Sequence, residues 1–351
     1  MTSTREMTGK PTLIKEVNIG LIKDALARMG QATRVELSRK TGISQPTVNV
    51  LMKELTEKGE VLSLGNANST GGRRAEVYTL NGKRYHIVSV IVRQDALEYC
   101  IFDLQLQKEV QRKITREDKI SYTDQLVSLL REIIRKTPDV RAVCVGVPGA
   151  VSDYGEVFAI PQIPEWEQFA LQSYLEEECA LQVKVINDIN AIAMGYLTSE
   201  MLTISFRQED GSRHPVRNLI YLHIEGTGLG AGIIIDGKLY SGCRSFAGEV
   251  GFMQIGEESM EQLLMGADDV QRAGVLSKVL INMICVLNPE KVVLGGNVDI
   301  SLVSAIQKQC SACLPDGVAP DFAMLPDSGE QYFMGLGQTG LGLLDHQVRL
   351  N

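Results

Sequence analysis

The sequence has no long uninterrupted apolar run. Its longest apolar stretches, 87–92 and 142–151, fall well short of the roughly 18–20 residues that a membrane-spanning helix needs. The first eleven residues are polar and do not form the apolar centre of a secretory signal. The seven cysteines are odd in number and scattered, which does not suggest a disulfide framework. From these absences we expect a cytoplasmic protein with no membrane partner.

The composition is not that of a disordered, collagen-like or coiled-coil protein. Hydrophobic residues make up 44% of the 351 residues and charged residues 22%, which is an ordinary globular balance. At roughly 150 residues to a domain, this length suggests two or three domains.

Charge is distributed unevenly along the chain. Residues 1–85 contain 14 Lys and Arg against 8 Asp and Glu, a net charge of +6. The rest contains 21 basic and 35 acidic residues, a net charge of −14. A basic head before an acidic body is typical of a nucleic-acid-binding domain attached to a different unit, although chance clustering on a solvated face would give the same count.

Within this basic head, the spacing of apolar residues predicts three helices. The first is expected over 15–29, and a capping-box pattern begins a short second helix over 33–40. Gly42 marks a tight turn, Ser44 caps the third helix and Gly59 ends it. This order is that of a helix-turn-helix, in which the last helix reads base edges with its N-terminal residues.

The predicted DNA contacts combine polar residues of the third helix with nearby basic residues. Gln and Asn suit the edge of adenine, Thr suits a polar edge or a thymine methyl group, and Arg and Lys neutralise phosphates. Two strands, 61–64 and 76–80, are expected to form a wing whose glycine-rich loop ends in paired arginines. The predicted set is Arg34, Ser44, Gln45, Thr47, Asn49, Lys53, Arg73 and Arg74. A three-helix interaction module that never touches DNA is the alternative.

In the acidic body, a buried strand at 181–186 ends in Asn187-Asp188, where a helix begins. Ligands of α/β proteins bind beyond the carboxyl ends of strands, beside helix N-termini. Asp188 would be the general base in an enzyme that activates a hydroxyl group, and it would accept hydrogen bonds from sugar hydroxyls in a binding protein. A helix cap is the third interpretation.

Two glycine-rich segments lie further along the body. Glu225–Gly230 separates two predicted strands, so it does not fit the dinucleotide-binding fingerprint, which requires a helix at this place. Glycines between strands let a backbone approach a phosphate or a sugar closely. Gly295-Gly296-Asn297 follows a strand at 291–294 and is interpreted as a turn.

The combination of motifs resembles the ROK family (repressors, open reading frames and kinases), and more narrowly its transcriptional regulators, because the kinases lack the head. The motifs are, in chain order, the helix-turn-helix, STGGRR (69–74), VPGAV (147–151), NDINAIAMG (187–195), EGTGLGAGIIIDGKL (225–239), AGEVGF (247–252) and VVLGGN (292–297). The resemblance implies an α/β fold with an actin-like, sugar-kinase-type two-lobed body after an all-α winged helix-turn-helix domain.

The same resemblance implies the domain boundaries and the effector contacts. Residues 1–82 would form the DNA-binding domain, 83–190 with 335–351 the first lobe, and 191–334 the second lobe, which also serves oligomerisation. An effector would bind in the cleft between the lobes. The implied effector-binding residues are Gly149, Asn187, Asp188 and Glu249. Asn offers a donor and an acceptor together, and carboxylates accept from paired hydroxyls, which suits a polyol.

Three departures from the family pattern bear on activity. The kinases hold ATP phosphates in an Asp-x-Gly-Gly-Thr hairpin, but the matching residues 90–95 contain no glycine. The ligands of the family's zinc knuckle are missing after Gly248, and zinc needs about four of them. Phe252 replaces a His that would help hold a sugar, and it is expected to turn inward where a zinc-binding His would have pointed. We therefore expect no catalytic residue, no metal and no cofactor.

The sequence thus predicts a DNA-binding transcriptional regulator, a repressor of carbohydrate metabolism or transport genes. Its expected partners are duplex operator DNA, a sugar-like effector and further copies of the chain in a homodimer or higher homo-oligomer. The alternatives are a ROK-type sugar kinase with an extra DNA-binding domain, a regulator controlled by a protein partner, and a body that only dimerises.

Overall fold

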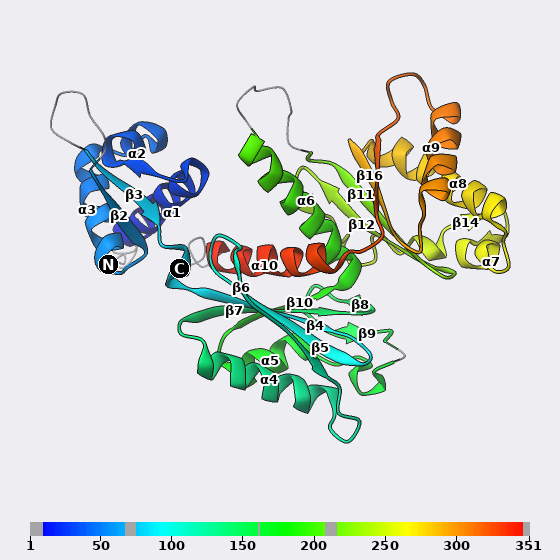
Figure 1. Ribbon diagram of the computed structural model, residues 1–351, viewed down its shortest axis with the longest axis horizontal. Helices are drawn as coiled ribbons and strands as arrows, with labels where there is room; N and C mark the ends of the chain where they lie inside the picture. The colour runs from blue at the N-terminus through cyan, green and yellow to red at the C-terminus, as the bar shows by residue number, and fades with distance from the viewer. Residues whose placement is uncertain (1–9, 67–74, 161, 208–215, 347–351) are drawn as a thin grey trace, which may run out of the picture.

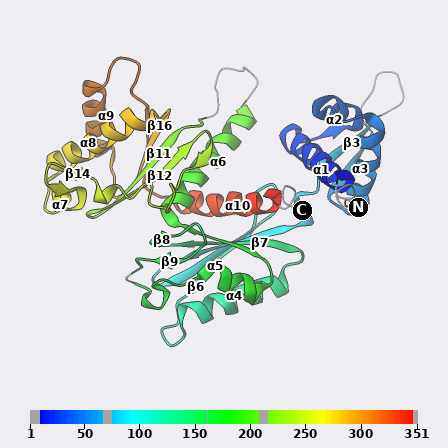
Figure 2. The same ribbon diagram turned by 180° about the vertical axis from the view of Figure 1, so that it is seen from behind.

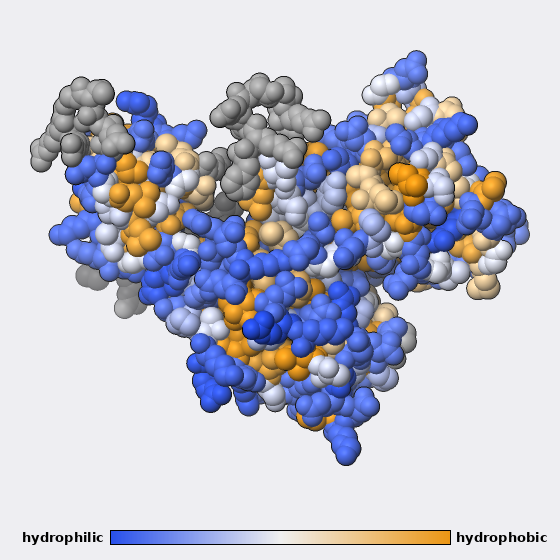
Figure 3. Space-filling view, viewed as in Figure 1, coloured by the Kyte–Doolittle hydropathy of each residue, from blue (hydrophilic) through white to orange (hydrophobic). Residues whose placement is uncertain are grey.

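The computed structural model describes residues 10–66, 75–160, 162–207 and 216–346, which form a small head and a larger body of two α/β lobes. Figure 1 shows the head, in blue, to one side of the lobes, and Figure 2 shows the same arrangement from behind. Hydrophilic residues cover most of the visible surface in Figure 3. The buried apolar residues form one cluster in the head, one in each lobe, and one shared by the two lobes.

The head contains three helices and a three-stranded antiparallel sheet. The helices are α1 (Lys10–Met29), α2 (Arg34–Thr41) and α3 (Gln45–Glu57), and the sheet has the order β1 (Ala32–Thr33), β3 (Glu76–Leu80), β2 (Val61–Asn66). The predicted capping box of Thr33 and Glu36 begins α2, and Gly42 ends it in the left-handed conformation. The extra strand β1 gives the head more β-structure than an all-α description implies. It escaped prediction because two residues carry no periodicity.

The first lobe is a mixed sheet covered by helices on both faces. Its strand order is β10 (Gln182–Asn187), β7 (Val140–Val147), β4 (His86–Val92), β5 (Ala96–Phe102), β6 (Lys108–Thr115). Alternate residues of a strand point to opposite faces. Val88 and Val90 therefore pack beneath α4 (Tyr122–Lys136) and α5 (Leu171–Cys179), whereas Ile87 and Ile91 face α10 (Gly329–His346).

The second lobe repeats this plan. Its strand order is β13 (Lys238–Leu239), β12 (Gly228–Ile235), β11 (Leu219–Glu225), β16 (Lys291–Gly296), β17 (Asp321–Leu325). Ile220 and Leu222 face α8 (Asp269–Leu287) and α9 (Ile300–Cys313), whereas Leu219 and Tyr221 face α6 (Asp188–Arg207). The smaller elements are β8 (Ala150–Val151), β9 (Val157–Phe158), β14 (Gln254–Ile255), β15 (Glu258–Ser259), α7 (Met260–Leu264) and the 3₁₀ turns Gly82–Arg84, Pro164–Trp166 and Val250–Phe252.

Among the helices that the structure describes, one, α8, is long and apolar enough to cross a membrane by length and composition alone. It has 19 residues, and the mean hydropathy of its most apolar window is 1.5. Charged residues such as Arg272 and Lys278 interrupt it, so no unbroken apolar run marks it in the sequence. Its buried face, which includes Leu276 and Leu280, packs in the core of the second lobe.

Helices α6 and α10 cross where their backbones touch. A Cβ atom added at Gly335 would lie 1.8 Å from the carbonyl oxygen of Ala191, and one added at Gly195 would lie 1.7 Å from that of Gln331. Both positions require glycine, because no side chain fits into such a space. Since α6 lies on the sheet of the second lobe and α10 on the sheet of the first, the crossing joins the two lobes.

We expect Gly335→Ala to destabilise the protein by about 1–3 kcal/mol, because the added methyl group overpacks the crossing. Gly342→Ala in the same helix is the matched control, since a Cβ there would meet nothing within 4 Å. It should be neutral or stabilise by up to about 1 kcal/mol. Urea unfolding measures both free energies, and equal effects of the two substitutions would contradict the tight crossing.

Candidate functional sites

Helix α3 presents a polar face to solvent. Ser44 starts the helix, because its Oγ accepts a hydrogen bond from the backbone N–H of Thr47 at 3.4 Å. The side chains that α3 buries are Val48, Leu51, Met52 and Leu55. Gln45, Asn49 and Lys53 are exposed, and the Lys53 ammonium lies 3.8 Å from the nearer carboxylate oxygen of Glu57. These three predicted DNA contacts therefore project from one side of the helix.

Three other predicted DNA contacts are engaged within the head. The hydroxyls of Ser44 and Thr47 are 2.9 Å apart and bond to each other. The guanidinium of Arg34 lies 3.8 Å from the Glu76 carboxylate and 5.0 Å from the ring centroid of Tyr78. Arg34 thereby ties the first turn of α2 to strand β3.

The exposed face of α3 also carries two residues that the sequence analysis did not select. Pro46 is exposed, and the exposed fraction of Val50 is 66%. An apolar side chain on such a face can contact the methyl group of thymine. Val50 could have been found from the sequence, because it follows Asn49 and is not one of the apolar residues that the helix was expected to bury. Arg73 and Arg74 lie outside the described residues, so their predicted contacts stay predictions.

In the body, Asn187 connects the end of strand β10 to the turn at Gly149. The Asn187 Nδ2 donates to the carbonyl oxygen of Gly149 at 2.8 Å. Gly149 has a φ of 97°, and a Cβ there would lie 2.7 Å from the Ile160 side chain. Glycine is therefore required at this turn. The structure thus brings Asn187 and Gly149 together, and their contact with an effector stays a prediction.

Asp188 occupies the first position of α6. Its Oδ1 accepts from the backbone N–H of Ile189 at 2.8 Å and from Asn187 Nδ2 at 2.9 Å. Burial raises the pKa of the Asp188 carboxyl above its ordinary value. The bond from Ile189 and the nearby His223 and Arg93 oppose this rise. The carboxyl is thus both a local hydrogen-bond acceptor and a desolvated group.

Glu249 joins Asp188 in an acidic cluster. It follows Gly248, where an added Cβ would lie 1.9 Å from the carbonyl oxygen of Ala231. Burial raises the pKa of Glu249, and the negative charges of Asp188 and Glu261 add to the rise. Carboxylates brought together in this way suit a ligand that donates several hydrogen bonds, such as a polyol.

Three side chains near Asp188 were missed by the sequence analysis, namely Arg93, His223 and Tyr332. Tyr332 of α10 is only 3% exposed, and its hydroxyl has no hydrogen-bond partner among the described residues. Burial raises the pKa of this hydroxyl, and the charge of Asp188 adds to the effect. A buried unpaired hydroxyl can bond to a ligand or a water molecule. No sequence signal marked Tyr332, because its helix comes from the far end of the chain.

The turn between β4 and β5 carries side chains where a phosphate cradle needs glycine. Strand β4 ends at Val92 and β5 begins at Ala96, and the backbone N–H of Arg93 donates to the carbonyl oxygen of Ala96 at 2.9 Å. The Arg93 Nε donates to the Glu98 carboxylate at 3.0 Å. No glycine allows close approach of the turn's backbone to a phosphate chain.

The expectation that Phe252 turns inward is wrong. Its exposed fraction is 67%, and its ring lies beside that of Phe246 with the centroids 5.6 Å apart. The 3₁₀ turn over Val250–Phe252 buries Val250 and Gly251 and leaves the third residue outside. Within the described ranges, no group of three or more His, Cys, Asp and Glu side chains is placed to hold a metal ion.

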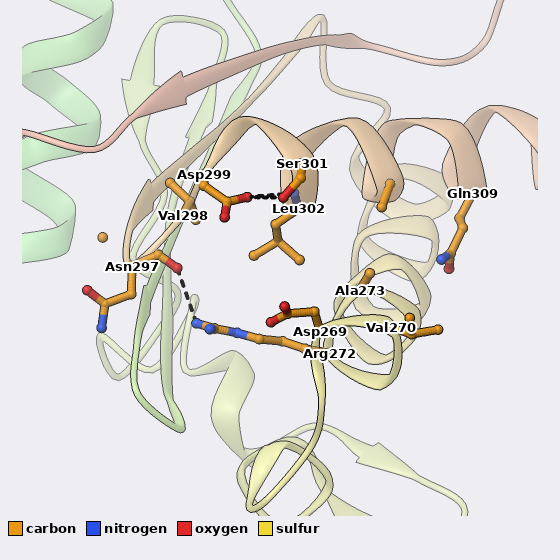
Figure 4. A pocket seen from close by; sticks show the side chains of 12 residues that line it. Asp269, Val270, Arg272, Ala273, Asn297, Val298, Asp299, Ser301, Leu302 and Gln309 are labelled. Atoms are coloured by element: carbon orange, nitrogen blue, oxygen red, sulfur yellow. Dashed lines mark hydrogen bonds between the residues drawn. The ribbon is translucent and has the colours of Figure 1, made fainter.

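A separate cavity of about 550 Å³ lies in the second lobe between α8, the end of β16 and α9 (Figure 4). The turn at Gly296 and Asn297 forms one wall, and the Asn297 carbonyl accepts from the Arg272 guanidinium at 3.2 Å. Asp299 caps α9 and bonds to the hydroxyl of Ser301. The turn predicted at 295–297 therefore also forms the wall of a cavity lined by both polar and apolar side chains.

Comparison with known proteins agrees with this architecture. Residues 88–262 match the model of the ROK family, and residues 24–59 match that of winged helix-turn-helix DNA-binding domains. The xylose repressor of Caldicellulosiruptor bescii is 30% identical over 256 residues, which cover 70% of this chain and 61% of that protein. The DNA-binding transcriptional dual regulator NagC of Escherichia coli is 25% identical over 70% of this chain and 59% of its own length. The matches thus span about 60% of these relatives.

Solved structures share the fold. A ROK family transcriptional regulator, a homologue of the E. coli MLC protein, superposes with a TM-score of 0.75 at 19% identity, covering 96% of this chain and 99% of its own. The ROK hexokinase of Thermus thermophilus gives a TM-score of 0.59 at 18% identity, covering 74% of this chain and 99% of its own. The chain is therefore similar in fold to a regulator over the head and body and to a kinase over a smaller share.

The raised pKa of Asp188 predicts a stability effect that depends on pH. When the pKa of a carboxyl is higher in the folded protein than in the unfolded chain, ionisation of that carboxyl destabilises the fold. The loss of stability begins as the pH rises past the pKa in the unfolded chain, which is about 4. Asp188→Asn should therefore raise the thermal midpoint at pH 7, and the gain should vanish as the pH falls to about 4. Asp299→Asn is the control and should lower the thermal midpoint at pH 7, because hydrogen bonds lower the pKa of the Asp299 carboxyl in the folded protein. A midpoint for Asp188→Asn below that of the wild type at pH 7 would contradict the prediction.

Proposed function

Since the chain belongs to the ROK family, we propose that it is a sequence-specific DNA-binding transcriptional regulator, a repressor of carbohydrate metabolism or transport genes. The observation that carries this proposal is the exposed polar face of α3, with Gln45, Asn49 and Lys53, on a basic winged head joined to the family's body. Several relatives are named as repressors, including two xylose repressors. The protein would act in the cytoplasm on duplex operator DNA.

DNA reading is proposed for the N-terminal half of α3. Gln45 and Asn49 lie one helical turn apart and are both exposed, so they can enter a major groove together. Val50 would supply a thymine contact, and Lys53 a phosphate contact. Ser44, Thr47 and Arg34 would act indirectly by holding α3 and the wing in place, because the two hydroxyls bond to each other and the guanidinium of Arg34 forms an ion pair with Glu76. A homodimer would double the few base contacts that one head offers.

Effector binding is proposed at the acidic cluster of the body. Asn187, Asp188 and Glu249 would bind the hydroxyl groups of a sugar-like ligand, and Gly149 would shape the turn beside them. Glu261 and the unpaired hydroxyl of Tyr332 would complete the set. Ligand binding would bring the lobes together about the α6–α10 crossing and so change the placement of the heads. Such coupling requires different effector affinities in the two states, typically by about 1–3 kcal/mol.

A sugar kinase is the second candidate, because Asp188 could serve as a base and the fold is shared with kinases. The turn at Arg93 argues against it, since phosphoryl transfer depends on positioning the phosphates and neutralising their charge. We therefore propose a body that binds a sugar without phosphorylating it.

We expect the double variant Gln45→Ala/Asn49→Ala to lose sequence preference, by about 1–3 kcal/mol for each affected base pair. The measurement is fluorescence anisotropy with the duplex that the wild type selects from a random pool, and with scrambled duplexes. Lys53→Ala is the contrast variant, because loss of a phosphate contact should weaken all duplexes alike and flatten the salt slope by about one unit. Unchanged preference in the double variant would refute the assignment of α3.

We expect Asp188→Asn and Glu249→Gln to reduce the effect of a sugar on DNA affinity while leaving DNA binding without sugar unchanged. The panel begins with xylose and N-acetylglucosamine, the sugars in the names of the relatives. A ligand at about 100 times its Kd should add roughly 2.7 kcal/mol of stability to the wild type, which thermal shift detects. ATP consumption with the same sugars should be absent. Sugar phosphorylation that disappears in Asp188→Asn would establish the kinase instead.

A further inference from the structure

The segment that joins the head to the first lobe, residues 81–86, is hydrogen-bonded to both sides. We call it the strap. On the head side, the Asn81 side chain donates to the carbonyl oxygen of Gly59 at 2.8 Å, and its backbone N–H donates to that of Glu60 at 2.9 Å. On the body side, the carbonyl oxygen of Gly82 accepts from Leu104 at 2.9 Å. The strap is therefore built into both domains and is not a free linker.

Arg84 bonds to both domains with a single side chain. Its Nε donates to the carbonyl oxygen of Lys58 in the head at 3.2 Å, and its Nη1 donates to the Asp139 carboxylate in the body at 2.5 Å. A guanidinium is planar and presents its donors in fixed directions, so one side chain can hold two partners at a fixed angle. A lysine has a single nitrogen on a flexible stem and cannot reproduce this geometry.

The side chain of Arg84 runs past the end of the head's last helix. A Cβ at Gly59 would lie 3.6 Å from Arg84 Cδ, so the stem of the arginine runs directly beside this glycine. On the body side, the guanidinium of Arg84 bonds to Asp139. The φ of Asp139 is 50°, which lies in the left-handed region that non-glycine residues rarely adopt. Its carbonyl oxygen accepts from the backbone N–H of His86 at 3.1 Å. Asp139 thus fixes the strap with its backbone and Arg84 with its side chain.

The ring of Tyr85 contacts two arginines, so the contacts of Arg84 can be compared with those of Arg141. The guanidinium of Arg84 lies 4.6 Å from the centroid of the Tyr85 ring, and that of Arg141 on strand β7 lies 4.5 Å from it. The two arginines therefore contact the same ring at nearly equal distances. Of these two arginines, Arg84 donates a hydrogen bond to the head, from its Nε to the carbonyl oxygen of Lys58.

We propose that Arg84 is a positioning residue that sets the orientation of the head on the first lobe and, in a dimer, the separation of the two recognition helices. The proposal rests on the proposed function. The side chains of Arg84 and Asp139 are 30% and 42% exposed, and ion pairs this accessible contribute little to stability. Removing the pair should therefore change the geometry of the heads without unfolding the protein.

The experiment measures how strictly the full-length protein requires a given spacing between DNA half-sites. The duplex that the wild type selects from a random pool is compared with one in which about five base pairs are inserted between the half-sites. This insertion turns one half-site to the opposite side of the helix. A single half-site gives the affinity of one head alone.

The wild type should bind the lengthened duplex about 100-fold more weakly, because two fixed heads cannot both engage it. Arg84→Ala should reduce this penalty to about tenfold or less, with half-site affinity and melting temperature unchanged. Arg84→Lys should behave like Arg84→Ala, because it cannot hold both partners. Asp139→Asn, which tolerates the left-handed backbone, should add nothing in the Arg84→Ala background. Arg141→Ala is the matched control and should keep the full penalty.

The remaining outcomes separate this inference from the proposed function. A wild type without a spacing penalty, or an unchanged penalty in both Arg84 variants, would overturn the inference and leave DNA binding intact. Loss of half-site affinity in both variants would show that Arg84 supports the head's fold, which also overturns it. A wild type that selects no duplex would overturn the proposed function and, with it, the inference.

Discussion

The backbone contact between α6 and α10 determines where the groups around Asp188 meet. Asp188 is the first residue of α6, and Gly195 lies two turns later on the same helix. Tyr332 lies one turn before Gly335 on α10. Because the two glycines leave no space for a side chain, the helices can meet in only one register. A buried tyrosine from the end of the chain is thereby held near a carboxylate from its middle.

Burial around this crossing has an energetic cost. Asp188 and Glu249 are both desolvated, which raises the pKa of each carboxyl, and the negative charge of Asp188 raises the pKa of Glu249 further. The hydroxyl of Tyr332 adds a buried donor with no partner among the described residues. A fold optimised for stability alone would pair or remove such groups, whereas a site that must receive a polar ligand keeps them available. Two desolvated carboxyls and one buried hydroxyl without a partner among the described residues lie in this region, and together they support a binding role for it.

The head and the end of strand β10 could be predicted because their signals are local. A capping box, a turn glycine and a strand that ends in Asn187-Asp188 are each visible within a few residues. The contacts of Arg34 could not be predicted, because its partners come from a wing strand about forty residues away. The outward position of Phe252 follows from the turn that buries its two neighbours. Tyr332 depends on a helix packing against strands from another part of the chain.

The body and the head contribute different kinds of chemical groups to the contact between them. The body supplies the side chain of Asp139, and the strap supplies that of Arg84. The head supplies backbone carbonyl oxygens, those of Lys58, Gly59 and Glu60, and every amino acid possesses this group. Substitutions in the head can therefore alter which bases are read while the attachment point stays the same. In evolutionary terms, the gene of the proposed regulator could diverge toward new operators through the codons of its head, while the connection to the body is kept.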